Sequence, residues 1–204
     1  MTQDIFDAWA IPGSVEVPRA TSAALGPEFS MRSLSIESRW LNGLADTLIK
    51  GSSRLRKRKA ADLAQILGIA GSRFLKEGDP FRTKALELLP RASGLSAPMA
   101  RAVLDGMAAD WVEDRLCGLL SNEFGTSDAL DGFVKQNGCQ TMAIGADLCV
   151  QIVSGSVPGV GVTALIRSLL TKAPTLLKPG RGDVVLPVLF MQALAVIDQD
   201  LAEN

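Results

Sequence analysis

A glycine-rich segment near the C-terminus has the residue types that can contact a phosphate. The pattern G-x-G-x-x-G/A fits residues 159–164, with Gly159, Gly161 and Ala164 at its fixed positions, between a predicted strand and a predicted helix. Glycines at such a turn let the backbone approach a pyrophosphate, and the start of the helix offers unpaired N–H groups. The same glycines could instead let the helix lie close against the sheet. The pattern alone leaves both interpretations open.

Two cations follow the next predicted strand. Lys178 and Arg181 lie in the loop 178–183, where the ribose of a bound nucleotide usually lies in a parallel sheet. An acidic residue at this place favours a free ribose 2′-hydroxyl, whereas Lys and Arg favour a 2′-phosphate. The alternative is a solvated loop in which Asp183 caps the last helix.

The composition excludes several kinds of catalysis. The chain has no His and no Tyr, which excludes a His general base, a His metal ligand and Tyr-Lys dehydrogenase chemistry within it. Cys117, Cys139 and Cys149 have no C-x-x-C spacing, and an odd number argues against a closed set of disulfides. We therefore expect buried or half-buried free thiols and no metal site.

Charge and hydropathy favour a globular chain without a nucleic-acid or membrane partner. The 204 residues are 47% hydrophobic and 21% charged, with a formal net charge of −1. Five cations lie between Arg54 and Lys59, a run that could bind nucleic acid but is more typical of a solvated helix face. The longest apolar run, 184–197, is too short to cross a bilayer, and residues 1–18 do not have the pattern of a signal peptide. A cytoplasmic protein is the expectation.

The periodicity of apolar residues divides the chain into three parts. Residues 1–33, which contain three prolines, are predicted to be an irregular N-terminal arm. Residues 34–125 are predicted to be helical, and residues 126–204 to form a partial nucleotide-binding domain. The fold class is therefore α/β.

Local signals predict where the helices of the middle part begin and end. Residues 51–53 are expected to break the first helix, and Asp79 with Pro80 to start another that Pro90 closes. A third long helix is expected from Ser96 to Gly125. Trp40 and Trp111 occur at helical spacing and are expected in the core.

Two strands decide where the glycine turn and the cationic loop lie. Residues 148–153 and 175–177 are predicted strands, separated by a helix at 160–172. Short strands are also predicted at 132–134 and 141–144. A strand–helix–strand order puts two parallel strands side by side, with their following loops at one edge of the sheet. The glycine turn and the Lys178 loop are therefore expected to be neighbours.

Both loops resemble one enzyme family. Residues 150–162 (VQIVSGSVPGVGV) are similar to the loop after the first nucleotide-domain strand of acyl-CoA reductases of the bacterial bioluminescence type, and residues 170–179 (LTKAPTLLKP) to their next strand. A more diffuse resemblance extends back to about residue 35. The family lies in the aldehyde dehydrogenase superfamily. It implies a helical N-terminal region followed by the first β-α-β-α half of an aldehyde-dehydrogenase-like Rossmann domain, which is incomplete and lacks the catalytic domain.

The resemblance also implies an activity. Enzymes of this family reduce an acyl-CoA thioester to the aldehyde with NADPH, through an acyl-cysteine intermediate. Ser156 stands where the family usually has Asn, at a position beside the developing oxyanion, and a hydroxyl is the shorter donor. The implied cofactor-binding residues are Gly155, Ser156, Val157, Pro158, Lys178, Pro179 and Arg181.

The family's nucleophilic cysteine lies in a later domain, so no catalytic residue is assigned in this chain. We therefore expect the N-terminal part of an NADPH-dependent acyl-CoA reductase, without turnover by the 204 residues alone. Its expected partners are the acyl-CoA substrate and either a second copy of the chain or the missing C-terminal half. The alternative is a non-catalytic nucleotide-binding or assembly module derived from such an enzyme.

Overall fold

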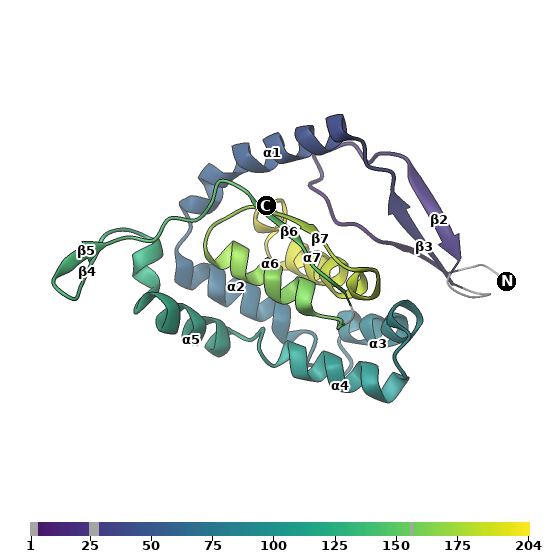
Figure 1. Cartoon of the computed structure of the whole chain (residues 1–204). Coiled ribbons are helices and arrows are strands. Elements are labelled where there is room, and N and C mark those ends of the chain that lie inside the picture. Colours follow the sequence, from purple (N-terminus) through teal and green to yellow (C-terminus); the bar gives the residue numbers. More distant parts are fainter. Residues whose placement is uncertain (1–3, 25–28, 156) are drawn as a thin grey trace.

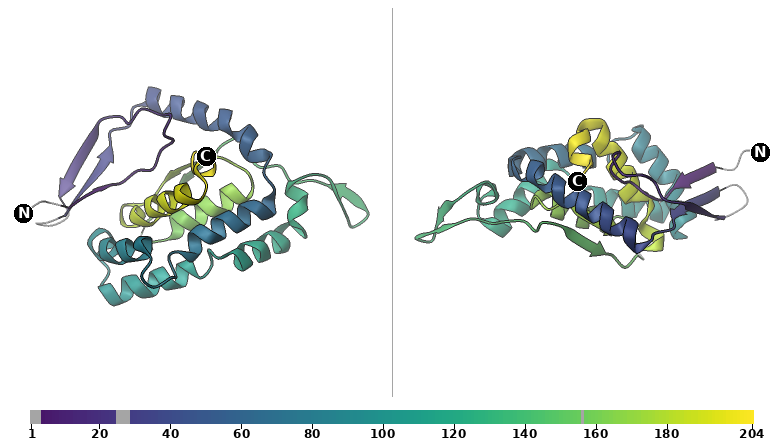
Figure 2. Two further views of the ribbon diagram at one scale, coloured as in Figure 1. Left: turned by 180° about the vertical axis from the view of Figure 1, so that it is seen from behind. Right: turned by 90° about the horizontal axis from the view of Figure 1, so that it is seen from above.

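The fold joins a body of helices to three small sheets. The structure is a computed structural model that describes residues 4–24, 29–155 and 157–204. Figure 1 shows the helix α1 (Ser38–Arg56) along one side and the helices α3 (Pro80–Ser93), α4 (Ala97–Ala108) and α5 (Glu113–Phe124) along the other. Between them lie α2 (Ala60–Ser72), α6 (Val160–Leu170) and α7 (Val185–Ile197), with the strands β6 (Cys149–Ile152) and β7 (Thr175–Lys178). The N-terminal sheet and the hairpin of residues 134–141 extend from opposite ends of this body (Figure 2). The mixture of helices and short sheets is consistent with the α/β class.

The described N-terminal residues include three strands, which corrects the prediction of an irregular arm over residues 1–33, although the segment 8–19 between the first two strands is irregular. The strand β3 (Phe29–Leu34) pairs in parallel with β1 (Asp4–Asp7) and antiparallel with β2 (Ala20–Ala24). Phe6 and Phe29 are buried in the main core. The strands are short, and β1 pairs with residues 25 positions away, so local composition does not reveal this sheet.

Five helices follow the N-terminal sheet, and several of their ends differ from the predicted ones. Asp79 begins the third helix as predicted, because its side chain accepts a hydrogen bond from the Phe81 N–H. Pro90 does not end that helix, which continues to a left-handed Gly94. The five are α1 (Ser38–Arg56), α2 (Ala60–Ser72), α3 (Pro80–Ser93), α4 (Ala97–Ala108) and α5 (Glu113–Phe124).

Two predicted helix boundaries are wrong for reasons of packing. α1 runs through residues 51–53, where a Cβ atom on Gly51 would lie 3.1 Å from the side chain of Asn204. The long helix predicted from Ser96 is divided into α4 and α5. At this division Trp111 turns into the core, and its backbone lies so close to α2 that Gly71 has no room for a Cβ atom.

Trp111 lies at the centre of the core. Its side chain is 1% exposed and meets the rings of Phe74 and Phe190 edge-on, with centroid separations of 6.0 and 6.1 Å. Its indole N–H donates to the hydroxyl of Thr163 at 3.0 Å. The prediction that Trp111 is a core residue is confirmed, whereas Trp40 is only half-buried.

A hairpin connects the helices to the C-terminal unit. The short helix η1 (Ser127–Leu130) leads into β4 (Val134–Gln136) and β5 (Cys139–Thr141), which are antiparallel. Asn137 and Gly138, both with positive φ, form the turn between the strands. The strands predicted in this region are present, but shifted by a few residues.

The C-terminal unit has the predicted strand–helix–strand order. The strands β6 (Cys149–Ile152) and β7 (Thr175–Lys178) are parallel neighbours, and α6 (Val160–Leu170) connects them. Gln151 faces α6 and donates to the Ala164 carbonyl, whereas Val150 and Ile152 on the other face are 58% and 79% exposed. The chain then forms η2 (Arg181–Asp183), α7 (Val185–Ile197) and α8 (Gln199–Ala202).

Within the described ranges, no helix combines the length and apolar character needed to cross a bilayer. The basic run between Arg54 and Lys59 is partly used in ion pairs. Arg56 pairs with Asp147, and Arg58 pairs with Asp198 through both of its terminal nitrogens. These pairs anchor the end of α1 to distant parts of the chain, so the run is not simply a solvated face.

Replacing Asp198 with Asn should lower the free energy of unfolding at about pH 7 by about 1–3 kcal/mol, because the Arg58 guanidinium loses its charged acceptor. That guanidinium holds the pKa of Asp198 below its ordinary value, although burial opposes the shift. A lowered carboxyl pKa gives its full stabilisation above the ordinary aspartate range, and this stabilisation is lost as the pH falls from that range through the lowered pKa of the folded state. Urea denaturation should therefore show the full loss at about pH 7 and a smaller loss at about pH 3.

Asp46, which is exposed on α1, gives a matched control. Asp46→Asn should change the free energy of unfolding by less than about 0.5 kcal/mol at either pH. An Asp198→Asn effect that is equally large at both pH values would contradict the assignment to charge.

Candidate cofactor site

The two loops predicted to be neighbours meet at the end of the parallel strands. The Val153 N–H donates to the Lys178 carbonyl at 3.0 Å, which extends the β6–β7 ladder into both loops. Just beyond this bond the backbones of Gly155 and Gly180 touch, and a Cβ atom on either glycine would overlap the backbone of the other. Glycine is therefore required at both positions by close approach of the two main chains.

Asp183 has a different role from the predicted one. Its carboxylate accepts hydrogen bonds from the N–H groups of Gly159 at 2.5 Å and Gly161 at 2.6 Å. It therefore caps the start of α6, the helix before it, and gives no side-chain cap to α7. Its side chain, at 0% exposure, fills the space at the N-terminus of α6.

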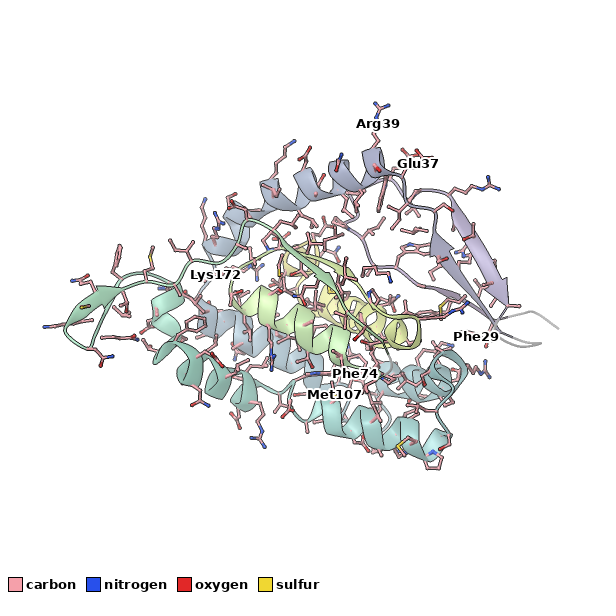
Figure 3. The ribbon with its side chains drawn as sticks, in the orientation of Figure 1. Phe29, Glu37, Arg39, Phe74, Met107 and Lys172 are labelled. Carbon is pink, nitrogen blue, oxygen red and sulfur yellow. The ribbon has the colours of Figure 1, made fainter. Side chains whose placement is uncertain are left out.

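The glycine pattern therefore serves helix packing rather than a pyrophosphate. The N–H groups of Gly159 and Gly161 are already bonded to Asp183, and a Cβ atom on Gly161 would lie 2.9 Å from that carboxylate. Gly159 has a φ of 100° and lies against the side chain of Met107 (labelled in Figure 3). Of the two interpretations left open by the sequence, close packing is the one that fits this geometry.

Lys178 and Arg181 are both exposed, and neither has an ion-pair partner among the described residues. Both line a cavity of about 860 Å³, a volume typical of small-molecule sites. The cavity lies between the N-terminal sheet, α1 and the exposed face of β6 and β7. Apolar side chains dominate its walls, including Trp9, Trp40 and Ile152.

The predicted site residues are not equally placed for a ligand. Pro179 lines the cavity beside Lys178 and Arg181. Gly155 is half-buried against the Lys178 loop, and Ser156 lies outside the described residues. Three of the predicted cofactor residues therefore border the cavity.

The remaining two predicted residues belong to the turn before α6. Val157 is 47% exposed, whereas Pro158 is buried in the protein interior. Neither borders the cavity. A ligand in the cavity would therefore contact the Lys178 loop more extensively than this turn.

The three cysteines are free thiols that differ in exposure. Cys117 and Cys149 are half-buried, but Cys139 is exposed on the hairpin, which corrects the expectation that all three are shielded. Burial raises the pKa of the Cys117 thiol, and the nearby charges of Glu113 and Asp114 act in the same direction. The described part of the chain contains no group of three or more side chains arranged to hold a metal ion.

The buried ion pair between Lys172, in the turn from α6 to β7, and Asp131 was not predicted. Lys172 (labelled in Figure 3) has a φ of 59° and donates to Asp131 at 2.5 Å, and both side chains are more than nine-tenths buried. Asp131 also accepts from the Ala60 N–H at 3.0 Å. The pair fixes the turn between α6 and β7 to the start of α2. No local sequence pattern indicates it, because its partners are 41 residues apart.

The fold and the site thus define a class of protein, an α/β chain with a ligand-sized cavity along the exposed face of a parallel strand pair and the loop that follows it. Residues 59–204 match the family described as acyl-CoA reductase (LuxC). The chain belongs to this family, which confirms the resemblance found in its two loops.

Curated relatives carry a more specific name. The chain is 25% identical over 171 residues to a long-chain acyl-protein thioester reductase of Photobacterium phosphoreum, a match that covers 81% of this chain and 34% of the relative. The protein of the same name from Aliivibrio fischeri is 24% identical over 152 residues, covering 70% and 31%. That from Photorhabdus luminescens is 27% identical over 128 residues, covering 60% and 26%. The chain spans about a third of the length of the curated relatives it matches.

Proposed function

We propose that this chain provides the cofactor-binding part of an NADPH-dependent acyl thioester reductase. Membership of the acyl-CoA reductase family and the names of the relatives support reduction of an acyl thioester. The reaction would release an aldehyde after hydride transfer to an acyl-cysteine, with the cysteine supplied by a part of the enzyme outside these 204 residues. The setting we propose is the cytoplasm, and the substrate is an acyl-CoA or an acyl-protein thioester.

The observation that carries the cofactor proposal is the position of Lys178 and Arg181. Both cations border the cavity at the carboxyl end of β7, where parallel sheets bind the ribose of a nucleotide. A 2′-phosphate on that ribose would supply the anion that these side chains lack among the described residues. NADPH carries this phosphate and NADH does not.

The cofactor's pyrophosphate would lie away from the start of α6. Asp183 already accepts the N–H groups that a pyrophosphate would use there, and two anions in one buried position would repel. NADPH would therefore extend from Lys178 into the cavity instead of across the N-terminus of α6.

Replacing Lys178 with Ala should weaken NADPH binding about 10- to 100-fold, the loss expected when one charge-assisted contact to a phosphate is removed. NADH should bind with nearly the same affinity to both forms, because it lacks the 2′-phosphate. Titration of each cofactor into the purified chain, followed by nicotinamide fluorescence, measures both affinities.

Lys57→Ala is the matched control, since Lys57 is an exposed cation that does not line the cavity and has no ion-pair partner in the described part of the chain. It should leave both affinities unchanged. Equal weakening by Lys57→Ala and Lys178→Ala would indicate a general charge effect and refute the proposed site.

The second candidate function is that of a non-catalytic assembly module. The observation that favours it is the exposed apolar face of β6, where Val150 and Ile152 meet solvent. Sedimentation of the chain over a range of concentrations distinguishes the two functions. Association without any NADPH binding would favour assembly, whereas NADPH binding by a monomer would favour the reductase.

A further inference from the structure

Asp183 connects the two loops of the proposed site from within the protein. It belongs to η2, at the end of the loop that carries Lys178 and Arg181. Its carboxylate is bonded to the main chain of Gly159 and Gly161, which are 24 and 22 residues away. One side chain therefore fastens the cationic loop to the glycine turn.

Backbone N–H groups, and no cationic side chain among the described residues, compensate the charge of the Asp183 carboxylate. Asp183 is fully buried and has no ion-pair partner among the described residues. The two N–H groups and the positive end of α6 supply the compensation that a bound phosphate receives at such a helix start. Burial raises the pKa of the Asp183 carboxyl, while the N–H bonds from Gly159 and Gly161 act in the opposite direction.

The space around Asp183 accepts little variation. A Cβ atom on Gly161 would lie 2.9 Å from Asp183 Oδ2 and 2.9 Å from Pro187 Cγ. The Asp183 N–H is itself fixed by the Gly180 carbonyl at 3.0 Å. The segment from Lys178 to Asp183 is thus held at three points, namely the strand ladder at Lys178, the glycine contact at Gly180 and the carboxylate at its end.

We propose that Asp183 is a positioning residue, an internal anion that orients the Lys178–Arg181 loop toward the 2′-phosphate of the cofactor. This inference rests on the proposed function. Asp183 touches neither cofactor nor substrate, and it acts by holding the loop against the start of α6. It would therefore govern the preference for a phosphorylated over an unphosphorylated dinucleotide.

Asp183→Asn tests the inference because the amide keeps the size but replaces one acceptor oxygen with a donor. The ratio of NADH to NADPH dissociation constants should fall about tenfold, the size of one lost charge-assisted contact at Lys178. Amide hydrogen exchange at Gly159 and Gly161 should become faster. Gly161→Ala should have the same effects, because its Cβ displaces the carboxylate without removing the charge.

Asp79→Asn is the control. Asp79 is a buried capping carboxylate at the start of α3, outside the lining of the cavity. It should lower the melting temperature but leave the cofactor ratio unchanged. A purely structural role for Asp183 predicts equal weakening of NADPH and NADH, or no weakening, and either result would overturn the positioning role while leaving the proposed function intact. Absence of NADPH binding to the unsubstituted chain would overturn the proposed function and the positioning role together.

Discussion

Gly180→Ala should abolish measurable NADPH binding and lower the free energy of unfolding by about 1–3 kcal/mol. The added Cβ would overlap the backbone of Gly155, so the two loops would have to separate. The φ of Gly180 is −70°, a value that any residue adopts, so the effect would come from this contact and not from backbone strain. Cofactor titration and urea denaturation on the same preparation measure the two losses.

Gly106→Ala provides the matched control for this substitution. Gly106 lies within α4, and a Cβ atom there would have no neighbour within 4 Å. Since Ala is the better helix former, Gly106→Ala should stabilise the chain by about 0.5–1 kcal/mol and leave NADPH binding unchanged. Wild-type affinity in Gly180→Ala would show that the contact between the loops is not needed for binding.

Trp111→Ala should cause the largest loss of stability, about 3–5 kcal/mol. The indole is almost completely buried between Phe74 and Phe190, and its removal would leave a cavity between the end of α2, α6 and α7. The substitution also removes the hydrogen bond to Thr163 in the first turn of α6. Urea denaturation followed by circular dichroism measures this loss.

Trp111→Phe separates packing from hydrogen bonding. The phenyl ring keeps most of the contact with the two aromatic neighbours but cannot donate to Thr163, so we expect a loss of about 1–2 kcal/mol. A loss below about 1 kcal/mol for Trp111→Ala would contradict the central place of this side chain in the core.

The sequence predicted the part of the fold that is organised locally. The apolar runs around Cys149–Ile152 and Thr175–Lys178, with a helix between them, predict a parallel pair because a crossover helix leaves few other arrangements. The meeting of the two loops then follows from the topology. Lys178 and Arg181 could be proposed as site residues for this reason, and both border the cavity.

Features that depend on distant partners could not be predicted in the same way. Asp183 precedes α7, so the local sequence predicts that it caps that helix. In the structure its carboxylate instead caps the start of α6. In the N-terminal sheet Asp4–Asp7 pairs with Phe29–Leu34, and no pattern in either segment indicates this pairing. The residue type of Gly51 predicts a helix break, but α1 continues through it and Asn204, far away in sequence, lies against it.

NADPH is proposed to bind in the cavity beside the Lys178 loop, and backbone amide NMR of the chain titrated with NADPH tests this position. The largest shifts should fall on Val150, Ile152 and residues 175–181, which line the cavity. Gly159 and Gly161 should show small shifts, because their N–H groups remain bonded to Asp183. Shifts that are largest at the start of α6 would contradict the account, because they would mean that the pyrophosphate displaces Asp183. Saturable binding with no shift in either loop would place the cofactor elsewhere and refute the site.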